Sequence, residues 1–367
     1  MNYDLRLQDP TDPATIYLFE AVIEAMAGAS NGKGIFAFAS RDGVNSLLLD
    51  DAVTTFLGHA SFDLIVGIDA VTNRPTLERL QELQGEYQNL QVRVFWNRTK
   101  GLFHPKIARF ARDDGSQTVI FGSGNLTPGG LRDNFEAYSV LQSDPGEPVD
   151  LSSWDEFLAR HIANIRPIDE EALEQAARNI IRSGRRRRGV EPDVVTEVEE
   201  APPEKEKVET IPTPVTDRIL IAQLPKAGGD YGRWSQAHFN KDIIDQFFHA
   251  RPDSTQRVYL TARRPDGSLL PQEVRRIIYS QSNKNMKIEL GARKGEAYPA
   301  SGPPIAIFRE IQARTFQYMI LMPGETGYRQ MLRLTMNLPT VGRGLPRVLT
   351  DVSTVRTAWL GCSLVQP

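Results

Sequence analysis

The stretch that decides the fold runs from Gly101 to Val140 and reads GLFHPKIARFARDDGSQTVIFGSGNLTPGGLRDNFEAYSV. Apolar residues alternate with polar ones around the first histidine, a pattern typical of a strand that places its polar side chains on one face. A second strand is predicted over 117–121 and a third over 135–141, with a glycine-rich corner between them. Adjacent strands in this order would bring five polar side chains together: His104, Lys106, Ser123, Asn125 and Glu136.

These five side chains suit phosphoryl transfer. A histidine can act as a nucleophile or a general acid, and a lysine supplies a fixed positive charge for a phosphate. Serine and asparagine donate neutral hydrogen bonds to phosphate oxygens, and a glutamate can orient a histidine. Taken singly, His-Pro-Lys is more often a solvated strand surface, and Gly-Ser-Gly-Asn an ordinary turn. Their order and combination favour a catalytic site over that alternative.

The pattern H-x-K at 104–106 followed by G-S-x-N at 122–125 resembles the phospholipase D superfamily. It is most similar to the branch of single-motif nucleases that includes metal-independent restriction endonucleases. The resemblance implies that His104 is the nucleophile, that Lys106 and Asn125 bind phosphate with support from Ser123, and that Glu136 contacts the histidine of a partner chain. The longer superfamily pattern has an aspartate five residues after the lysine, where this chain has Ala111. That departure affects the lipid-type signature more than the nuclease one.

Short buried strands alternate with amphipathic helices around this stretch. Strands are predicted over 34–40, 62–70 and 90–96, and helices over 14–28, 43–57, 74–87, 151–165 and 168–182. Such alternation predicts an α/β domain with a partly parallel sheet, which we assign to residues 1–183 as the phospholipase D-like domain.

Length and composition limit the other possibilities. A chain of 367 residues is long for one core, so two domains are expected. The single cysteine, Cys362, allows neither an intrachain disulfide nor a cysteine-based zinc site and suits a reducing cytoplasm. The N-terminus lacks a signal pattern, and no apolar run approaches the ~20 residues of a membrane helix. No phosphate-loop motif or metal-binding histidine spacing is present, so we expect no cofactor and no metal ion.

Charge is unevenly distributed along the chain. Residues 216–367 contain 21 basic and 12 acidic side chains, a net charge of +9, whereas the rest of the chain carries 22 basic and 34 acidic ones. A basic half suggests an anionic partner, and double-stranded DNA is the simplest. Residues 184–216 contain four arginines at 185–188 and continue rich in Glu, Pro and Val, so they are predicted to be a linker.

The C-terminal half, 217–367, is predicted to be a mostly β domain. Short strands are expected over 218–224, 256–262, 286–290, 306–308, 315–321 and 328–334, with helices over 239–248 and 271–279. This half resembles the B3-like DNA-binding fold, a pseudobarrel whose loop arms enter the major groove and which is fused to phospholipase-type nucleases in some restriction enzymes. The candidate base-reading side chains, each of which could instead be an ordinary surface residue, are Arg233, Gln236, Asn240, Lys241, Arg263 and Arg264.

The sequence therefore predicts a metal-independent DNA endonuclease of the restriction or phage-defence type that acts through a phosphohistidine. Because that mechanism needs two histidines and the chain has one H-x-K motif, a homodimer with a shared site is expected. One alternative is a nuclease subunit of a defence complex that depends on a helicase or translocase partner. The other is a lipid phosphodiesterase, which is disfavoured because no membrane-binding stretch is found.

Overall fold

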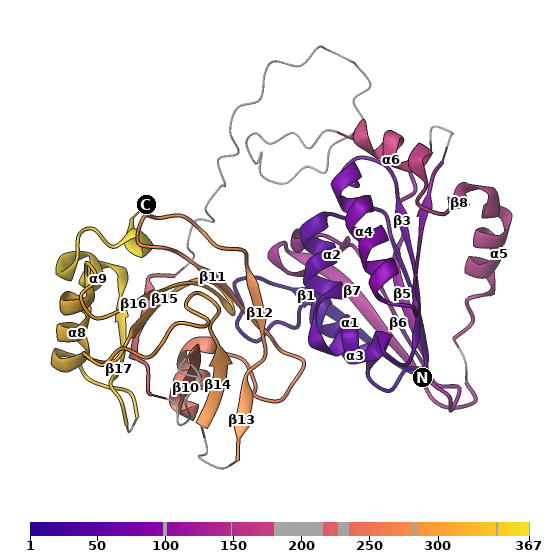
Figure 1. The fold of residues 1–367 in the computed structure, drawn as a ribbon. Coiled ribbons are helices and arrows are strands. Elements are labelled where there is room, and N and C mark those ends of the chain that lie inside the picture. Colours follow the sequence, from indigo (N-terminus) through magenta and orange to yellow (C-terminus); the bar gives the residue numbers. More distant parts are fainter. Residues whose placement is uncertain are drawn as a thin grey trace.

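The computed structural model describes residues 1–97, 101–147, 149–179, 216–226, 235–281, 285–342 and 344–366. They form an N-terminal part, residues 1–179, and a C-terminal part, residues 216–366, which lie side by side (Figure 1). The predicted linker lies almost wholly outside the described residues, and so does the predicted DNA contact Arg233.

The N-terminal part is built on an eight-stranded mixed sheet in the order β1-β7-β6-β5-β2-β3-β4-β8. Strands β2, β3 and β4 are parallel to one another, and every other pairing is antiparallel. The predicted α/β fold with a partly parallel sheet is thus confirmed. The strands are β1 (Asn2–Gln8), β2 (Asn31–Phe36), β3 (Ser61–Gly67), β4 (Leu90–Phe95), β5 (Lys106–Ala111), β6 (Gln117–Gly122), β7 (Glu136–Ser143) and β8 (Ile165–Arg166).

Helices cover the two faces of this sheet unequally (Figure 1). The main core lies between the sheet and α1 to α4, whereas α5 covers part of the opposite face over a small cluster that includes Phe95, Phe103 and Leu158. The helix predicted over 43–57 is two helices, because Asp50 accepts a hydrogen bond from Ala52 N and caps a new one. The helices are α1 (Leu18–Met26), α2 (Arg41–Leu48), α3 (Asp51–Leu57), α4 (Arg74–Glu86), α5 (Ser152–Arg160) and α6 (Glu170–Ala177), with short turns η1 (Gly129–Asp133) and η2 (Ile162–Asn164).

The C-terminal part has three layers. A six-stranded sheet in the order β12-β11-β16-β15-β9-β17 is covered on one face by α8 and α9 and on the other by a three-stranded sheet, β10-β14-β13, with α7 and η4. The strands are β9 (Arg218–Gln223), β10 (Gln236–Phe239), β11 (Val258–Ala262), β12 (Glu273–Arg275), β13 (Ile278–Ser280), β14 (Asn285–Glu289), β15 (Ile305–Gln312), β16 (Thr315–Leu321) and β17 (Arg347–Asp351). The helical elements are α7 (Lys241–Ile243), η4 (Ile244–Phe248), α8 (Tyr328–Asn337), α9 (Val352–Ala358) and η5 (Ser363–Val365).

Several predictions for this part need correction. Among the described residues the strands form two open sheets and no closed barrel, so the B3-like pseudobarrel is not shown. The strand predicted over 328–334 is helix α8, whose buried residues Tyr328, Met331 and Thr335 follow helical spacing. The helix predicted over 271–279 is replaced by strands β12 and β13. Its run of β-branched residues suits a strand better than a helix.

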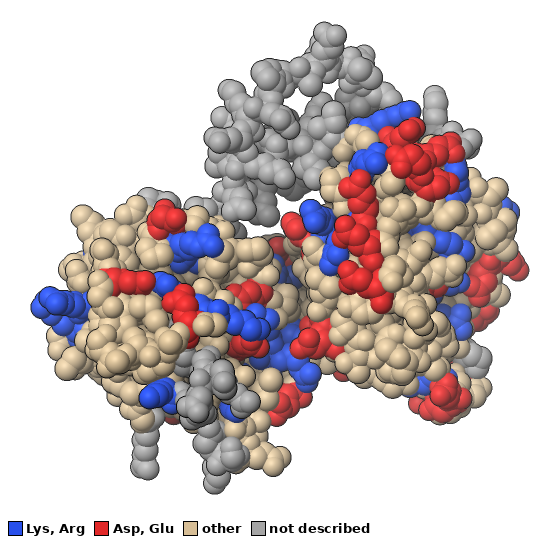
Figure 2. Space-filling model, viewed as in Figure 1, with Lys and Arg blue, Asp and Glu red and all other residues tan. Residues whose placement is uncertain are grey.

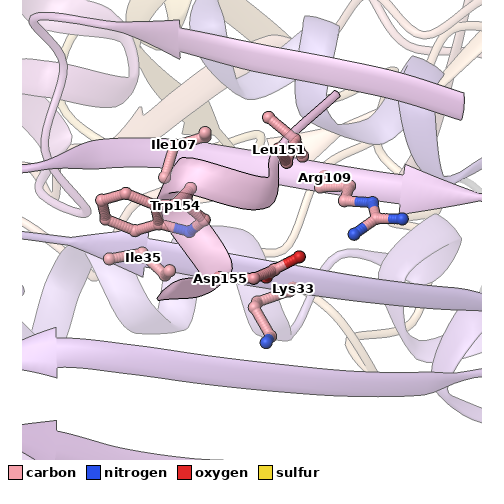
Figure 3. A pocket seen from close by; sticks show the side chains of 7 residues that line it. All are labelled: Lys33, Ile35, Ile107, Arg109, Leu151, Trp154 and Asp155. Atoms are coloured by element: carbon pink, nitrogen blue, oxygen red, sulfur yellow. The ribbon is translucent and has the colours of Figure 1, made fainter. Parts of the chain in front are cut away.

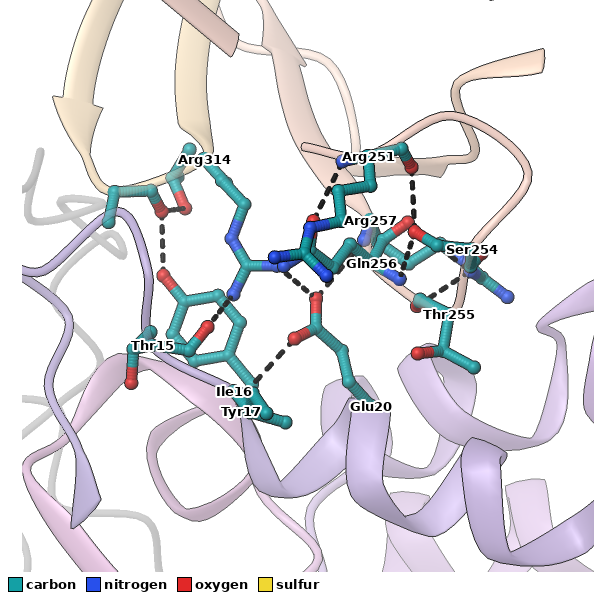
Figure 4. A network of polar contacts seen from close by, with 12 residues as sticks. Thr15, Ile16, Tyr17, Glu20, Arg251, Ser254, Thr255, Gln256, Arg257 and Arg314 are labelled. Atoms are coloured by element: carbon teal, nitrogen blue, oxygen red, sulfur yellow. Dashed lines mark hydrogen bonds and ion pairs between the residues drawn. The ribbon is translucent and has the colours of Figure 1, made fainter. Parts of the chain in front are cut away.

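The two parts are joined by two buried ion pairs, and Figure 4 shows the one between Glu20 and Arg314. The turn between β15 and β16 inserts Arg314 into the N-terminal part, where its guanidinium lies 2.6 Å from the Glu20 carboxylate in α1. Arg257 forms a second pair, 2.9 Å from Asp50. The four side chains are at most 5% exposed, so both pairs are almost fully removed from water.

Arg314→Ala should destabilise the protein strongly, because it leaves the Glu20 carboxylate buried without its charged partner. Breaking a buried pair in this way costs about 3–5 kcal/mol. Arg333→Ala, at an exposed position of α8, is the matched control and should change stability by less than about 0.5 kcal/mol. Urea unfolding of the full chain measures both; equal stabilities of the two variants would contradict the assignment.

Candidate active site

His104 and Lys106 lie together at the start of β5. The sequence pattern predicted a strand that contains both residues. Strand β5 instead begins at Lys106, and His104 belongs to the preceding loop. Lys106 Nζ lies 3.0 Å from Nδ1 and 2.9 Å from Nε2 of the His104 ring, and the ring meets Phe38 edge-on with centroids 5.5 Å apart. The contact places a cation directly against the imidazole ring.

The glycine-rich corner follows β6 and presents Asn125. Asn125 is 9% exposed, and its Oδ1 accepts a hydrogen bond of 3.1 Å from Phe38 N. Because the amide oxygen is used there, the NH2 group is the donor that a phosphate oxygen could meet. The corner requires glycine: a Cβ on Gly124 would lie 2.6 Å from Gly130 O, and one on Gly130 would lie 2.2 Å from Asn125 N. Backbone segments therefore hold Asn125 in place.

Ser123 and Glu136 form a hydrogen-bonded pair beside this corner. Ser123 Oγ donates to Glu136 Oε2, and Ala137 N donates to Ser123 Oγ at 3.1 Å. The other carboxylate oxygen of Glu136 accepts from Asn134 Nδ2 at 3.2 Å. The glutamate is thus held in a fixed orientation at the start of β7.

Strand register brings these residues to one end of the sheet. Ile107 pairs with Phe121, which sets Lys106 beside Gly122, and Gly122 pairs with Tyr138, two residues from Glu136. Lys106 also pairs with Phe36, the last residue of β2. The five predicted residues therefore gather where the parallel strands β2 and β3 end, the edge at which α/β sheets commonly bind ligands.

Sequence reasoning missed several residues at this edge. Gln8 is 1% exposed and donates to Asn134 O at 2.9 Å while accepting from Leu18 N at 2.9 Å. Asp69 follows β3, and burial raises the pKa of its carboxyl. Gln8 ends a strand whose alternation of polar and apolar residues could have been recognised, whereas Asp69 carries no local sequence signal.

Two shallow pockets flank strand β5. One lies on the α1 side of the sheet between Lys106, Gly124 and Leu18. The other lies beneath α5 on the opposite face (Figure 3). There the apolar side chains of Ile35, Ile107, Leu151 and Trp154 meet the charged ends of Lys33, Arg109 and Asp155. Of the five candidate residues, Lys106 lines the first pocket and none lines the second.

The predicted DNA contacts in the C-terminal part have different surroundings. Asn240 caps α7 by accepting from Ile243 N at 3.1 Å, and Arg263 is 8% exposed and donates to Ser363 O at 3.0 Å. Both side chains are therefore engaged within the fold, which leaves them poorly placed for reading base edges. Gln236 is half-buried on β10, whereas Lys241 and Arg264 are exposed.

The described residues contain no group of three or more His, Cys, Asp or Glu side chains arranged to hold a metal ion. None of their helices combines the length and the apolar character needed to cross a membrane.

Gly130→Ala should disturb Asn125 directly, because the added methyl group would overlap the backbone of that residue. We expect a loss of about 1–3 kcal/mol, as for other overpacked sites. Gly85→Ala in α4 is the matched control: its new methyl group meets nothing within 4 Å and should stabilise the helix by about 0.5–1 kcal/mol. Thermal unfolding distinguishes the two, and a neutral Gly130→Ala would refute the packing argument.

Comparison with known proteins gives structural similarity at low sequence identity. No family model and no curated protein matches the chain. NucT from Helicobacter pylori is 15% identical with a TM-score of 0.31 over 46% of this chain and 100% of its own. Nuc from Salmonella typhimurium, a phospholipase D family member, is 14% identical with a TM-score of 0.33 over 45% and 97%. The N-terminal domain of Helicobacter pylori LlaJI.R1 is 12% identical with a TM-score of 0.27 over 36% and 97%.

Proposed function

We propose that the chain is a DNA endonuclease that hydrolyses phosphodiesters through a phosphohistidine. The single observation that carries the proposal is the contact between Lys106 Nζ and the His104 ring at the sheet edge where Ser123, Asn125 and Glu136 also gather. An imidazole and a cation side by side supply a nucleophile for phosphorus and a charge for the phosphate it attacks.

In the proposed reaction a ring nitrogen of His104 attacks phosphorus, and the bond from phosphorus to the leaving oxygen breaks. A second histidine gives its proton to that oxygen. The same histidine then takes a proton from water, which attacks phosphorus and breaks the phosphorus–nitrogen bond. Lys106 and the NH2 group of Asn125 bind the non-bridging oxygens throughout, and Ser123 keeps Glu136 oriented. Both half-reactions conserve charge and protons without a further reactant.

The surface favours DNA contact away from α4 and α6. Acidic side chains form a band over these two helices, whereas acidic and basic side chains are interspersed over the C-terminal part (Figure 2). The acidic residues of α4 and α6 are Glu78, Glu82, Glu86, Glu170, Glu171 and Glu174. We therefore assign DNA contact in the C-terminal part to exposed positions such as Lys241 and Arg264. Gln236, which is close to Lys241 in sequence, belongs to the same proposed interface.

The first test is cleavage of plasmid DNA by the full chain in excess EDTA. Activity should persist, and His104→Ala should abolish it while DNA affinity stays within about twofold, because other cations supply the affinity. Loss of cleavage in EDTA with recovery in Mg²⁺ would reject the histidine mechanism. Cleavage that needs a nucleoside triphosphate and a partner would instead support the dependent-subunit alternative.

His104→Ala also serves as the binding-only background for the C-terminal contacts. Adding Arg264→Ala or Lys241→Ala to it should lower DNA affinity and reduce its salt dependence. Arg333→Ala, another exposed arginine, is the control in that background. Affinities that do not differ among these chains would remove Arg264 and Lys241 from the proposed interface.

We further propose a homodimer in which the second histidine is His104 of the partner subunit. In support, the edge strand β1 exposes Tyr3, Leu5 and Leu7 on one face, at 59%, 62% and 71%, and Phe121 adds to this apolar surface across β7. Large exposed apolar patches commonly mark protein contacts. We assign this apolar surface to contact with a second copy of the chain, because the proposed reaction needs two histidines and each chain supplies one His104.

Mixing subunits tests the shared site. Wild-type chains titrated with His104→Ala chains should lose activity as the square of the wild-type fraction, because only dimers with two histidines react. Leu5→Lys should separate the chains and lower activity, whereas Asn2→Lys adds the same charge to the other face of β1 and should not. Sedimentation measures the assembly; a linear fall in activity or a fully active monomer would exclude the dimer.

A further inference from the structure

The segment 129–134 touches two of the candidate catalytic residues. Its glycine backbone packs directly on Asn125, since a Cβ on Gly130 would lie 2.2 Å from Asn125 N. At its other end Asn134 Nδ2 donates to Glu136 at 3.2 Å. A shift of this segment would therefore move the phosphate donor and the carboxylate together.

The C-terminal part holds the same segment through two side chains. Arg132 is 6% exposed and donates from NH1 to Gln272 Oε1 at 2.8 Å, with its guanidinium 4.0 Å from the centre of the Tyr259 ring. Asp133 Oδ1 accepts from Gln312 Nε2 at 3.1 Å and from Arg132 Nε at 2.6 Å. Gln312 ends β15, next to the turn that carries the buried Arg314. The segment is thus fixed from outside the domain that contains the catalytic residues.

We propose that Arg132 and Asp133 are positioning residues through which the C-terminal part sets the geometry of Asn125 and Glu136. The inference rests on the proposed function, because it adds a condition for activity at that site: Arg132 and Asp133 must keep their contacts with Gln272 and Gln312. The physical reason is that phosphoryl transfer depends on donor placement, and a misplacement of about 1 Å can cost ~10²-fold in rate. A C-terminal part that moves on binding its ligand would change the rate through these contacts.

The test removes the contacts from the C-terminal side, leaving every residue near the reacting atoms intact. In the Gln272→Ala/Gln312→Ala double variant kcat on DNA should fall roughly tenfold, with KM within about twofold, because the donors are displaced and not removed. Gln272→Glu keeps an acceptor for Arg132 and, made alone, should retain kcat. Tyr17→Phe is the matched control: it deletes another hydrogen bond between the parts, from Tyr17 to Ala313 O at 2.6 Å, and leaves the hydrogen bonds of 129–134 in place.

Hydrogen exchange supplies a readout that does not depend on activity. The amides of Leu131 and Asn134 donate within the segment, to Thr127 O and Gly129 O at 2.9 Å each. They should exchange about tenfold faster in the double variant and remain unchanged in Tyr17→Phe. Unchanged exchange, or faster exchange with unchanged kcat, would overturn the inference. A wild-type chain that cleaves no phosphodiester would reject the proposed function instead, while the exchange result would still decide the coupling.

Discussion

The pairing of Glu20 with Arg314 is the contact on which the arrangement of the molecule depends. A carboxylate and a guanidinium that are each at most 1% exposed cost several kcal/mol to bury, and their attraction offsets this only while both parts are in place. Glu20 also accepts from Tyr17 N at 3.1 Å, closing the first turn of α1. The charge that joins the two parts is therefore the same charge that fixes where α1 begins.

That starting point matters because α1 leads to the edge of the sheet where the five candidate residues lie. Leu18, its first residue, packs against Gly124 and donates to Gln8 Oε1, and Gln8 in turn donates to Asn134 O. A continuous set of buried contacts thus runs from the ion pair to the segment beside Asn125 and Glu136. The backbone at Arg314 is strained. Its φ of +55° is a left-handed conformation that costs a non-glycine residue roughly 1–2 kcal/mol. The ion pair and the hydrogen bond to Thr15 O at 2.6 Å hold it there.

The sequence predicted what short-range patterns encode. Helix α4 was placed within one residue because Leu77, Leu80 and Leu83, which are buried, recur at helical spacing, a local signal. The common location of the five site residues followed from strand order alone. Strand β1 was missed although Asn2–Gln8 alternates, since its apolar face is exposed and has no core to match. The contacts of Arg314 and Arg257 could not be foreseen, because an arginine in a turn gives no indication of a carboxylate more than 200 residues away.

The same contacts change the meaning of the charge asymmetry. Four of the 21 basic residues counted in 216–367 are buried arginines: Arg257, Arg263, Arg314 and Arg347. Two of them, Arg257 and Arg314, form ion pairs with carboxylates of the N-terminal part. Their positive charge is therefore offset by Asp50 and Glu20 and is not available at the surface. The other two donate to backbone carbonyls, of Ser363 and His238. A guanidinium serves these roles because its planar fork can satisfy several acceptors at once. The net charge of +9 therefore overstates the number of cations at the surface of the C-terminal part, where Lys241 and Arg264 are exposed.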